Sequence, residues 1–413
     1  KERKPIFEAG IIQDELFSRA DILLPVGKDE WDIIEVKSGS RVKDLNIHDV
    51  AFQKYVYEKA GLKIRNCILM HLNSEYVRNG EIEPSELFIQ TDITEKMEEY
   101  SSNIKENIEK MFKVINGEEP EFSVDDILTI EYDNICKDEF IDNLPEDNIF
   151  QMYRMFTKDK IKLYKEGIIK IKDIPESTKL NKKQQIQRRL AFEGETHIEK
   201  DEIKNFLNTL KYPIYYLDFE TINPALPKFD GTKPYQQIPF QFSLHIQNEH
   251  KGELKHVSFL AEGISDPRQK FMQALKDNLG KEGSILVYNQ SFEKSRMRES
   301  ADYLPEFNDW YEENILPRIK DLWDPFKDFS YYNPKQKGSA SIKALLPIFS
   351  KLKYSDLELG NGAMASLEYE RVTYGEVEEA ERLKVYKALE EYCKMDTFAE
   401  VEIVDGLMEI LNS

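Results

Sequence analysis

One short apolar stretch contains two carboxylates, and it restricts the fold more than any other feature of the sequence. Residues 212–221 read YPIYYLDFET, a run of aromatic and β-branched residues that is typical of a strand. On a strand, residues i and i+2 point to the same face, so Asp218 and Glu220 project together. A carboxylate pair in this setting can bridge two Mg²⁺ ions. The stretch therefore predicts a strand that presents an acidic pair.

Two later motifs extend this pattern. The stretch 287–297, VYNQSFEKSRM, follows an apolar strand-like run and contains Asn289 and Glu293. The stretch 391–400, EYCKMDTFAE, lies in one or two amphipathic helices expected over 376–412, and it contains Tyr392 and Asp396. Together with the acidic strand, these motifs resemble the tyrosine-bearing branch of the DnaQ-like 3′–5′ exonucleases, which share the RNase H-like fold.

The resemblance implies a site with two Mg²⁺ or Mn²⁺ ions and a catalytic tyrosine. Tyr392 would orient the attacking water, and Asn289 would contact the substrate. Glu293 is a departure, because Glu stands where the family has Asp and adds one methylene to the side chain. The implied metal ligands and catalytic carboxylates are Asp218, Glu220, Glu293 and Asp396.

A second set of charged residues lies near the N-terminus. The stretch 32–37, DIIEVK, places Glu35 and Lys37 on one face of an expected strand, and the preceding strand can bring Asp21 beside them. Two carboxylates suit a hard divalent cation, and a lysine can orient water or neutralise a phosphate. In the helix expected over 46–60, Gln53 and Tyr57 share one face at i, i+4 spacing.

This order of Asp, ExK and QxxxY resembles the RecB-like branch of the PD-(D/E)XK nucleases. The resemblance implies a restriction-endonuclease-like mixed sheet and one or two Mg²⁺ or Mn²⁺ ions on Asp21 and Glu35. It also implies a catalytic role for Lys37 and substrate contacts from Gln53 and Tyr57.

Three further features of the family pattern can be compared with this sequence. Many relatives carry four cysteines for an iron–sulfur cluster, whereas Cys136 stands alone in the corresponding region, so we expect no cluster. The family has an upstream helix with an acidic residue, for which Glu8 or Glu15 could serve. His48 is either a further metal ligand or a polar residue at a helix start.

Composition limits the class of protein. The chain has 413 residues and a formal net charge of −20, which argues against a general polyanion binder. No run approaches the ~20 apolar residues of a membrane-spanning helix. Its three widely spaced cysteines exclude a disulfide framework and indicate a reducing, cytoplasmic location. The chain starts at Lys1, so we expect residues upstream to be missing.

The element pattern predicts an α/β chain with three parts. We expect a RecB-like domain at 1–118, truncated at its N-terminus, a mostly helical and partly basic connector at 119–205, and a DnaQ-like domain at 206–413. The stretches DVAFQKYV, LDFET, PYQQIPFQFSLH, YNQSFEKS and YCKMDT resemble an uncharacterised bacterial family that fuses these two nuclease domains.

Several other residues have two interpretations each. The basic connector residues would guide a nucleic-acid strand or form a solvated helix face. Asp321 is interpreted as a helix cap in preference to an outer carboxylate of the site. Lys343 is interpreted as a solvent-facing lysine in preference to a phosphate contact. The basic residues in question are Lys182, Lys183, Arg188 and Arg189.

The sequence thus predicts a metal-dependent nuclease with two sites that acts on DNA, with single-stranded DNA as the expected partner. A 3′–5′ exoribonuclease that processes RNA is one alternative. A catalytically weak nucleic-acid-binding or scaffold protein, with a protein partner in a defence or repair complex, is another.

Overall fold

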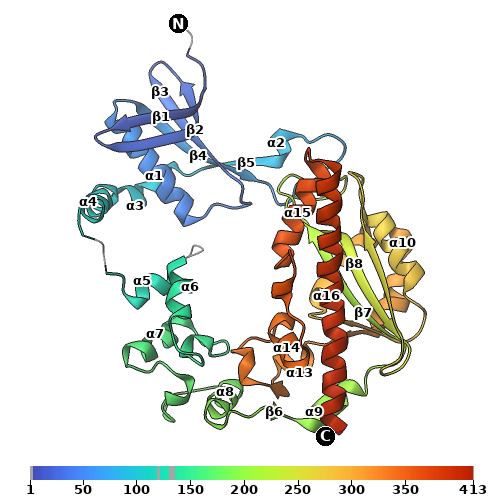
Figure 1. Ribbon diagram of the computed structural model, residues 1–413. Coiled ribbons are helices and arrows are strands. Elements are labelled where there is room, and N and C mark those ends of the chain that lie inside the picture. Colours follow the sequence, from blue (N-terminus) through green and yellow to red (C-terminus); the bar gives the residue numbers. More distant parts are fainter. Residues whose placement is uncertain (1–2, 119–120, 130–134, 413) are drawn as a thin grey trace. The chain divides into compact units, whose positions relative to one another are not determined.

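The chain is described by a computed structural model, which covers residues 3–118, 121–129 and 135–412. It divides into two compact units (Figure 1). The first comprises Lys1–Glu121 and Asn223–Gln236, and the second comprises Phe122–Ile222 and Gln237–Ser413. The segment expected as a connector at 119–205 therefore falls almost wholly within the second unit.

The first unit is built on a mixed sheet with the strand order β1-β2-β3-β4-β5. Strands β1 (Ile6–Gln13), β2 (Leu16–Val26) and β3 (Glu30–Lys37) pair antiparallel, whereas β4 (Lys63–Leu72) is parallel to β3. A parallel neighbour needs a crossover connection, and α1 (Asp44–Lys59) supplies it. Strand β5 (Phe88–Asp92) pairs antiparallel with β4, and the unit also contains α2 (Pro84–Leu87), α3 (Thr94–Ser101) and α4 (Ile104–Ile115).

Helix α1 closes the core of this unit. Its residues Val50, Val56 and Tyr57 are fully buried and pack in one cluster with Ile33 of β3 and Cys67 of β4. The predicted strands within 18–38 and the predicted helix at 46–60 are therefore present. The family's upstream helix is not seen at Glu8, which lies on strand β1 and forms an ion pair with Arg19.

The second unit begins with helices. They are α5 (Val124–Thr129), α6 (Ile135–Asp142), α7 (Thr157–Lys165), α8 (Lys182–Glu193) and α9 (Lys200–Leu207). Short 3-10 turns lie at Ile149–Gln151 and Ile171–Asp173. A small two-stranded sheet pairs β6 (His197–Ile198) with β12 (Tyr331–Tyr332).

The main sheet of the second unit has the strand order β11-β10-β7-β8-β9. Strands β7 (Ile214–Ile222), β8 (Ile238–Gln247) and β9 (Leu254–Leu260) pair antiparallel. Strands β10 (Ser284–Val287) and β11 (Ile319–Asp321) continue the sheet in parallel. The remaining helices are α10 (Arg268–Asn278), α11 (Ser291–Tyr303), α12 (Asn308–Trp310), α13 (Asp324–Lys327), α14 (Ile342–Phe349), α15 (Gly362–Tyr374) and α16 (Glu379–Asn412).

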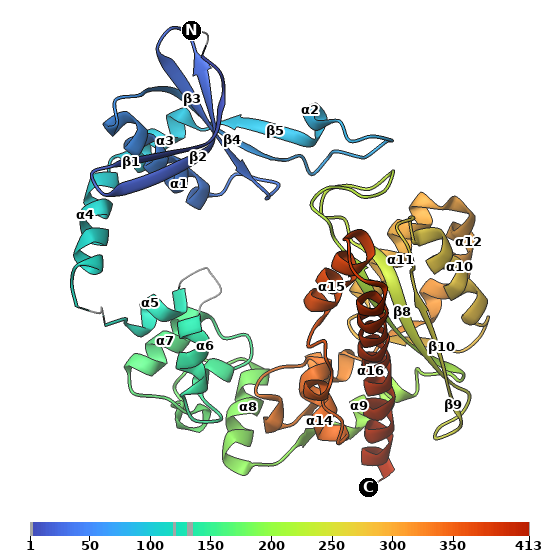
Figure 2. The ribbon, with the colours of Figure 1, turned by 45° about the horizontal axis from the view of Figure 1, so that its top comes forward.

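Helices cover both faces of this sheet. Helix α16, the long red helix in Figure 1, lies along β7 and β8. Figure 2 shows α10 and α11 on the other side of the strands. The predicted α/β class, with one mixed sheet near the N-terminus and a second flanked by helices, is confirmed. The predicted element order βββαβα is also present, from β7 to α11.

Candidate metal centre

The alternation of side chains along β7 positions the acidic pair. Tyr215, Leu217 and Phe219 pack in the core cluster that contains residues of α10. Tyr216 points the opposite way and packs with residues of α16. Since alternate residues share a face, Asp218 and Glu220 point toward α16. One apolar face of the strand is thus anchored, and the other presents the carboxylates.

Helix α16 completes a group of three carboxylates. Ligand oxygens of Asp218, Glu220 and Asp396 all lie within 4.8 Å of one another. Three converging carboxylate oxygens are the donor set that a hard divalent cation such as Mg²⁺ or Mn²⁺ takes. The structure therefore brings together three of the four carboxylates that the sequence predicted.

Crowding and burial raise the pKa values of this carboxylate group. Burial, and then the charges of Asp396 and Glu220, raise the pKa of Asp218 well above its usual range. Burial and the charge of Asp396 raise the pKa of Glu220 to about 8, against an opposing effect of Lys343. Negative charges this close repel one another, and a bound cation would relieve that repulsion.

Two tyrosines surround Asp396. The hydroxyl of Tyr354 donates a hydrogen bond of 2.5 Å to Asp396 Oδ1. The ring of Tyr392, one turn earlier on α16, lies 6.4 Å from the ring of Tyr354. Burial raises the pKa of Asp396 to about 6, while hydrogen bonds from both tyrosines and the charge of Lys343 oppose the rise.

Lys343, expected to face solvent, is only partly exposed and lies over these rings. Its Nζ is 5.1 Å from the ring centre of Tyr354 and 5.2 Å from that of Tyr392. The same ammonium donates a hydrogen bond of 2.7 Å to the carbonyl of Gly360. The side chain is thus partly exposed to solvent, as expected, while two aromatic rings and a carbonyl hold it beside the acidic group.

Glu293 lies deeper than the group of three. It is only 2% exposed, and its Oε2 has no hydrogen-bond partner among the described residues. Burial raises its pKa to about 8. Its charge acts on Asp218, yet it lies outside the set whose oxygens converge within 4.8 Å. Its predicted role as a metal ligand stays a prediction.

Asn289 and Asp321 shape the turn that leads to Glu293. Asn289 has a φ of +71°, and its backbone N–H donates to Asp321 Oδ1 at 2.9 Å. Asp321 also accepts hydrogen bonds from the backbone amides of Gln290 and Trp323. The interpretation of Asp321 as a helix cap is not confirmed, because Asp321 ends strand β11 and the N-cap residues of α11 and α13 are Gln290 and Trp323. The Asn289 side chain accepts a hydrogen bond from Ser291 Oγ.

Glu400 and Tyr354 are site neighbours that the sequence reasoning missed. Glu400 follows Asp396 by one turn of α16, is 1% exposed, and has an unpartnered Oε2 among the described atoms. Burial and then Asp218, Glu293 and Asp396 raise its pKa well above the usual range. Its i+4 spacing from Asp396 is the sequence signal for it. Tyr354 offers no such signal, because it lies on the connection between α14 and α15.

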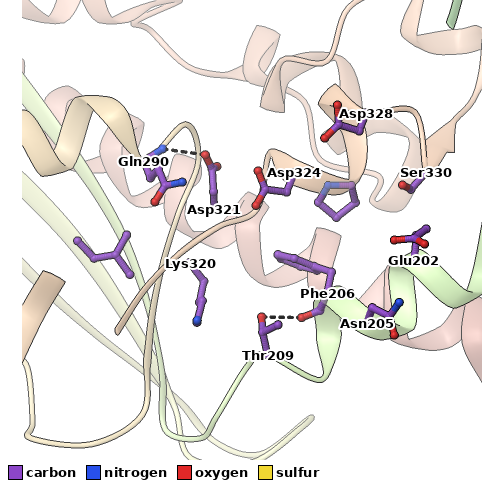
Figure 3. Close-up of a pocket in the computed structure, with 12 residues that line it drawn as sticks. Glu202, Asn205, Phe206, Thr209, Gln290, Lys320, Asp321, Asp324, Asp328 and Ser330 are labelled. Atoms are coloured by element: carbon purple, nitrogen blue, oxygen red, sulfur yellow. Dashed lines mark hydrogen bonds between the residues drawn. The ribbon is translucent and has the colours of Figure 1, made fainter. Parts of the chain in front are cut away.

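Asp321 also lines an acidic cavity that is separate from the three converging carboxylates (Figure 3). Its volume is about 530 Å³, and its lining includes Glu202, Lys320, Asp324 and Asp328. In Figure 3 the carboxylate of Asp321 points to Gln290, whose backbone amide it binds. None of the three converging carboxylates lines this cavity.

The predicted residues of the first unit also lie close together. The register that pairs Ile22 with Ile34 places Asp21 opposite Glu35. Asp21 Oδ2 accepts the amide of Val36 at 2.7 Å, and Lys37 Nζ contacts Glu35 Oε1 at 2.8 Å. Burial lowers the pKa of Lys37, but hydrogen bonds to Asp49 and Glu35 outweigh it, so that the pKa is raised.

Helix α1 contributes three residues to this region. Gln53 donates to Glu35 Oε2 at 2.9 Å, and Asp49, which the sequence reasoning missed, contacts Lys37 at 2.6 Å. Tyr57 is fully buried, and its hydroxyl bonds the backbone at Ala9 and Ala20. In this structure Tyr57 therefore holds β1 and β2 to the helix. The predicted contact of Tyr57 with a substrate is not seen, because its side chain is buried.

Other predicted residues have intramolecular contacts. His48 packs edge-on against Tyr100, and Cys136 is exposed, whereas Cys67 and Cys393 are buried. All four basic residues of α8 contact neighbours within the second unit. Lys182 pairs with Glu199, Lys183 with Asp328, Arg188 with the carbonyl of Pro175, and Arg189 with His197 and Glu193. Their predicted strand contact stays a prediction.

Among the helices of the described residues, none combines the length and apolar character that crossing a membrane requires.

Parts of this chain are similar in sequence to known proteins. A family model described as a domain of unknown function, DUF2779, matches residues 215–341, which include Asp218, Glu220 and Glu293 but end before Tyr392 and Asp396. The uncharacterized protein UU173 of Ureaplasma parvum serovar 3 is 29% identical over 47% of this chain and 31% of its own length. The uncharacterized protein MG366 of Mycoplasma genitalium is 26% identical over 51% of this chain and 34% of its own length. The chain thus matches about a third of the length of these relatives.

Proposed function

We propose that the chain is a metal-dependent phosphodiester hydrolase that acts on single-stranded DNA. In this proposal the second unit carries a 3′–5′ exonuclease site, and the first unit carries a RecB-like nuclease site. The single observation that carries the proposal is the convergence of Asp218, Glu220 and Asp396 within 4.8 Å, beside Tyr392.

The residues present fit one hard divalent cation at this group. Asp218, Glu220 and Asp396 would hold it, and it would supply Lewis-acid stabilisation of the phosphodiester. Glu293 and Glu400 are further buried carboxyls near this group with unpartnered oxygens among the described residues, and a bound cation would favour their ionised forms. Tyr392 would orient the attacking water, and Tyr354 keeps Asp396 in place through its hydrogen bond.

The first site fits a cation less well. Both oxygens of Glu35 already accept hydrogen bonds, one from Lys37 and one from Gln53. Among its described residues, the first unit holds no group of three converging ligand atoms. At this site we propose that Lys37, held between Glu35 and Asp49, contacts the phosphate of the strand that is cut.

A 5′-labelled DNA strand tests the second site. In Mg²⁺ or Mn²⁺, the wild-type chain should shorten the strand from its 3′ end. Asp218→Asn and Asp396→Asn should abolish this ladder, whereas Asp302→Asn, at an exposed position of the same unit, should retain it. A ladder that survives in Asp218→Asn would contradict the proposal. Faster loss of a matched RNA strand would favour RNA processing.

A strand with a blocked 3′ end isolates the first site. An inverted terminal nucleotide removes the 3′ hydroxyl, so only the first site could cut this substrate. Cleavage should then disappear in Lys37→Ala and persist in Asp218→Asn. An intact blocked strand in all samples would leave the exonuclease proposal in place and refute the first site as a nuclease.

A further inference from the structure

Three contacts hold the side chain of Lys343 in place. Lys343 is the second residue of α14, which Ser341 caps by accepting a hydrogen bond from the amide of Ala344. Its ammonium lies 5.1 Å and 5.2 Å from the ring centres of Tyr354 and Tyr392, within the range of cation–π attraction. A hydrogen bond of 2.7 Å to Gly360 O supplies the third contact.

Lys343 lies beside the carboxylate group without pairing directly with it. One of the rings under its ammonium belongs to Tyr354, whose hydroxyl donates a hydrogen bond to Asp396 Oδ1. The hydrogen-bond acceptor of Lys343, however, is the neutral carbonyl of Gly360. A lysine whose role was to neutralise these carboxylates would bind one of them directly, as Lys37 binds Glu35 in the first unit.

Donors remain on the ammonium for a ligand. A lysine carries three N–H donors. Within the part of the chain that the structure describes, Lys343 donates one hydrogen bond, so two of its donors are left. A ligand that accepts hydrogen bonds from this ammonium and also reaches a cation bound by the carboxylates must carry negatively charged oxygens. A phosphodiester has that chemistry, because its anionic oxygens accept hydrogen bonds from ammonium groups.

We propose that Lys343 is a substrate-binding residue, whose ammonium, held over the rings of Tyr354 and Tyr392, binds the phosphate of a nucleotide at the 3′ end of the strand. The proposal rests on the proposed exonuclease function of the second unit. Tyr354 links the two parts of this arrangement, because its ring contacts Lys343 while its hydroxyl holds Asp396. Tyr354 thereby fixes the distance between the ammonium that would bind the phosphate and the carboxylate of Asp396.

Binding without cleavage tests this role. A 5′-fluorescein DNA strand is titrated in Ca²⁺, which has the same oxygen preference as Mg²⁺, and anisotropy is recorded over a range of salt concentrations. Each phosphate contact contributes roughly 0.7 to the slope of log K against log salt for a single strand. Lys343→Gln should weaken binding about tenfold and lower the slope by about 0.7. Lys351→Gln, at an exposed lysine after α14, should change neither.

The outcomes separate this inference from the function on which it rests. Wild-type chain that neither binds nor shortens the strand would overturn both. Wild-type chain that does both, with an unchanged slope in Lys343→Gln, would overturn only the role of Lys343. Lys343→Arg retains the charge and should restore most of the slope, which distinguishes lost phosphate binding from a local packing defect. Equal thermal unfolding midpoints of the variants would confirm that the fold is intact.

Discussion

At the scale of single residues, Asp396 shows how this site controls a buried carboxylate. Burial disfavours its charge, and hydrogen bonds from Tyr354 and Tyr392 and the charge of Lys343 favour it. The result is a pKa of about 6, lower than the value of about 8 for Glu220. Asp396 therefore loses its proton at a lower pH than Glu220 does in the absence of a cation.

Tyr354→Phe should shift the pH dependence of metal binding. Loss of the hydroxyl removes a hydrogen bond to the charged form of Asp396, so the pKa of this carboxyl should rise above about 6. Protons compete with metals for carboxylates, so Mn²⁺ affinity should fall at a higher pH than in the wild type. Isothermal calorimetry across this pH range measures the shift. Tyr303→Phe, at a 40% exposed ring, is the control, and superimposable Tyr354→Phe and wild-type curves would refute the prediction.

Glu293 should make the metal-free chain less stable as pH rises. Its folded-state pKa of about 8 lies above the usual 4.5, so its stabilising effect is complete below pH 4.5 and is lost as pH rises through 8. The loss amounts to at most ~1.4 kcal/mol per pH unit in this window. Urea unfolding in EDTA should show at least this slope in the wild type and in the exposed control Glu306→Gln, because Asp218, Glu220 and Glu400 also have raised pKa values. Glu293→Gln should reduce the slope by up to this amount, and an equal slope in Glu293→Gln would contradict the assignment.

At the scale of elements, the close approach of α14 to α16 depends on one glycine. A Cβ built on Gly406 of α16 would lie 2.3 Å from Cδ1 of Phe349 at the end of α14. Phe349 also packs against Phe326 and Tyr331. The same α14 carries Lys343 at its start, so this contact helps to place the ammonium beside the carboxylates.

Gly406→Ala should therefore destabilise the chain, although alanine favours helices. In an open helix the change would stabilise by about 0.8–1.0 kcal/mol. Overpacking costs typically 1–3 kcal/mol, and here the ring of Phe349 must move, so the net effect should be a loss of up to roughly 2 kcal/mol. Urea unfolding measures this change. Glu390→Ala, at an exposed site on α16, should be close to neutral. A stabilised Gly406→Ala would show that the two helices separate freely.

Strands and helices with a clear residue periodicity could be predicted from the sequence. Contacts made by residues in irregular connections could not. The alternation of β7 correctly predicts that Asp218 and Glu220 share a face, and the pattern of the last forty residues predicts α16. Tyr354 reaches Asp396 through the connection between α14 and α15, for which no periodic signal exists. The contacts of Lys343 with two rings could not be predicted, because its position at a helix start does not show which rings lie beneath it.

At the scale of the whole molecule, the chain passes between its two units more than once. Strand β7 ends at Ile222, and the next segment, Asn223–Gln236, belongs to the first unit before β8 begins at Ile238. Within the first unit, Arg78 anchors this segment by donating to the carbonyls of Pro227 and Lys228 at 3.0 Å and 2.6 Å. The acidic strand and an element of the other unit are thus consecutive in the chain.

Arg78→Ala should loosen the segment 223–236 without disturbing β7. Two side-chain hydrogen bonds to backbone carbonyls are lost together with an ion pair to Asp230. The hydrogen bonds alone, at about 1 kcal/mol each, correspond to roughly thirtyfold faster local opening. Hydrogen exchange followed by mass spectrometry should show faster exchange in peptides covering 223–236. Peptides of β7 should keep their protection, because residues such as Leu217 are fully buried in the core of the second unit. Arg41→Ala removes an exposed arginine of the same unit and should leave 223–236 unchanged. Equal exchange in the two variants would mean that the backbone bonds between Arg78 and both Gly231 and Thr232 suffice to hold the segment.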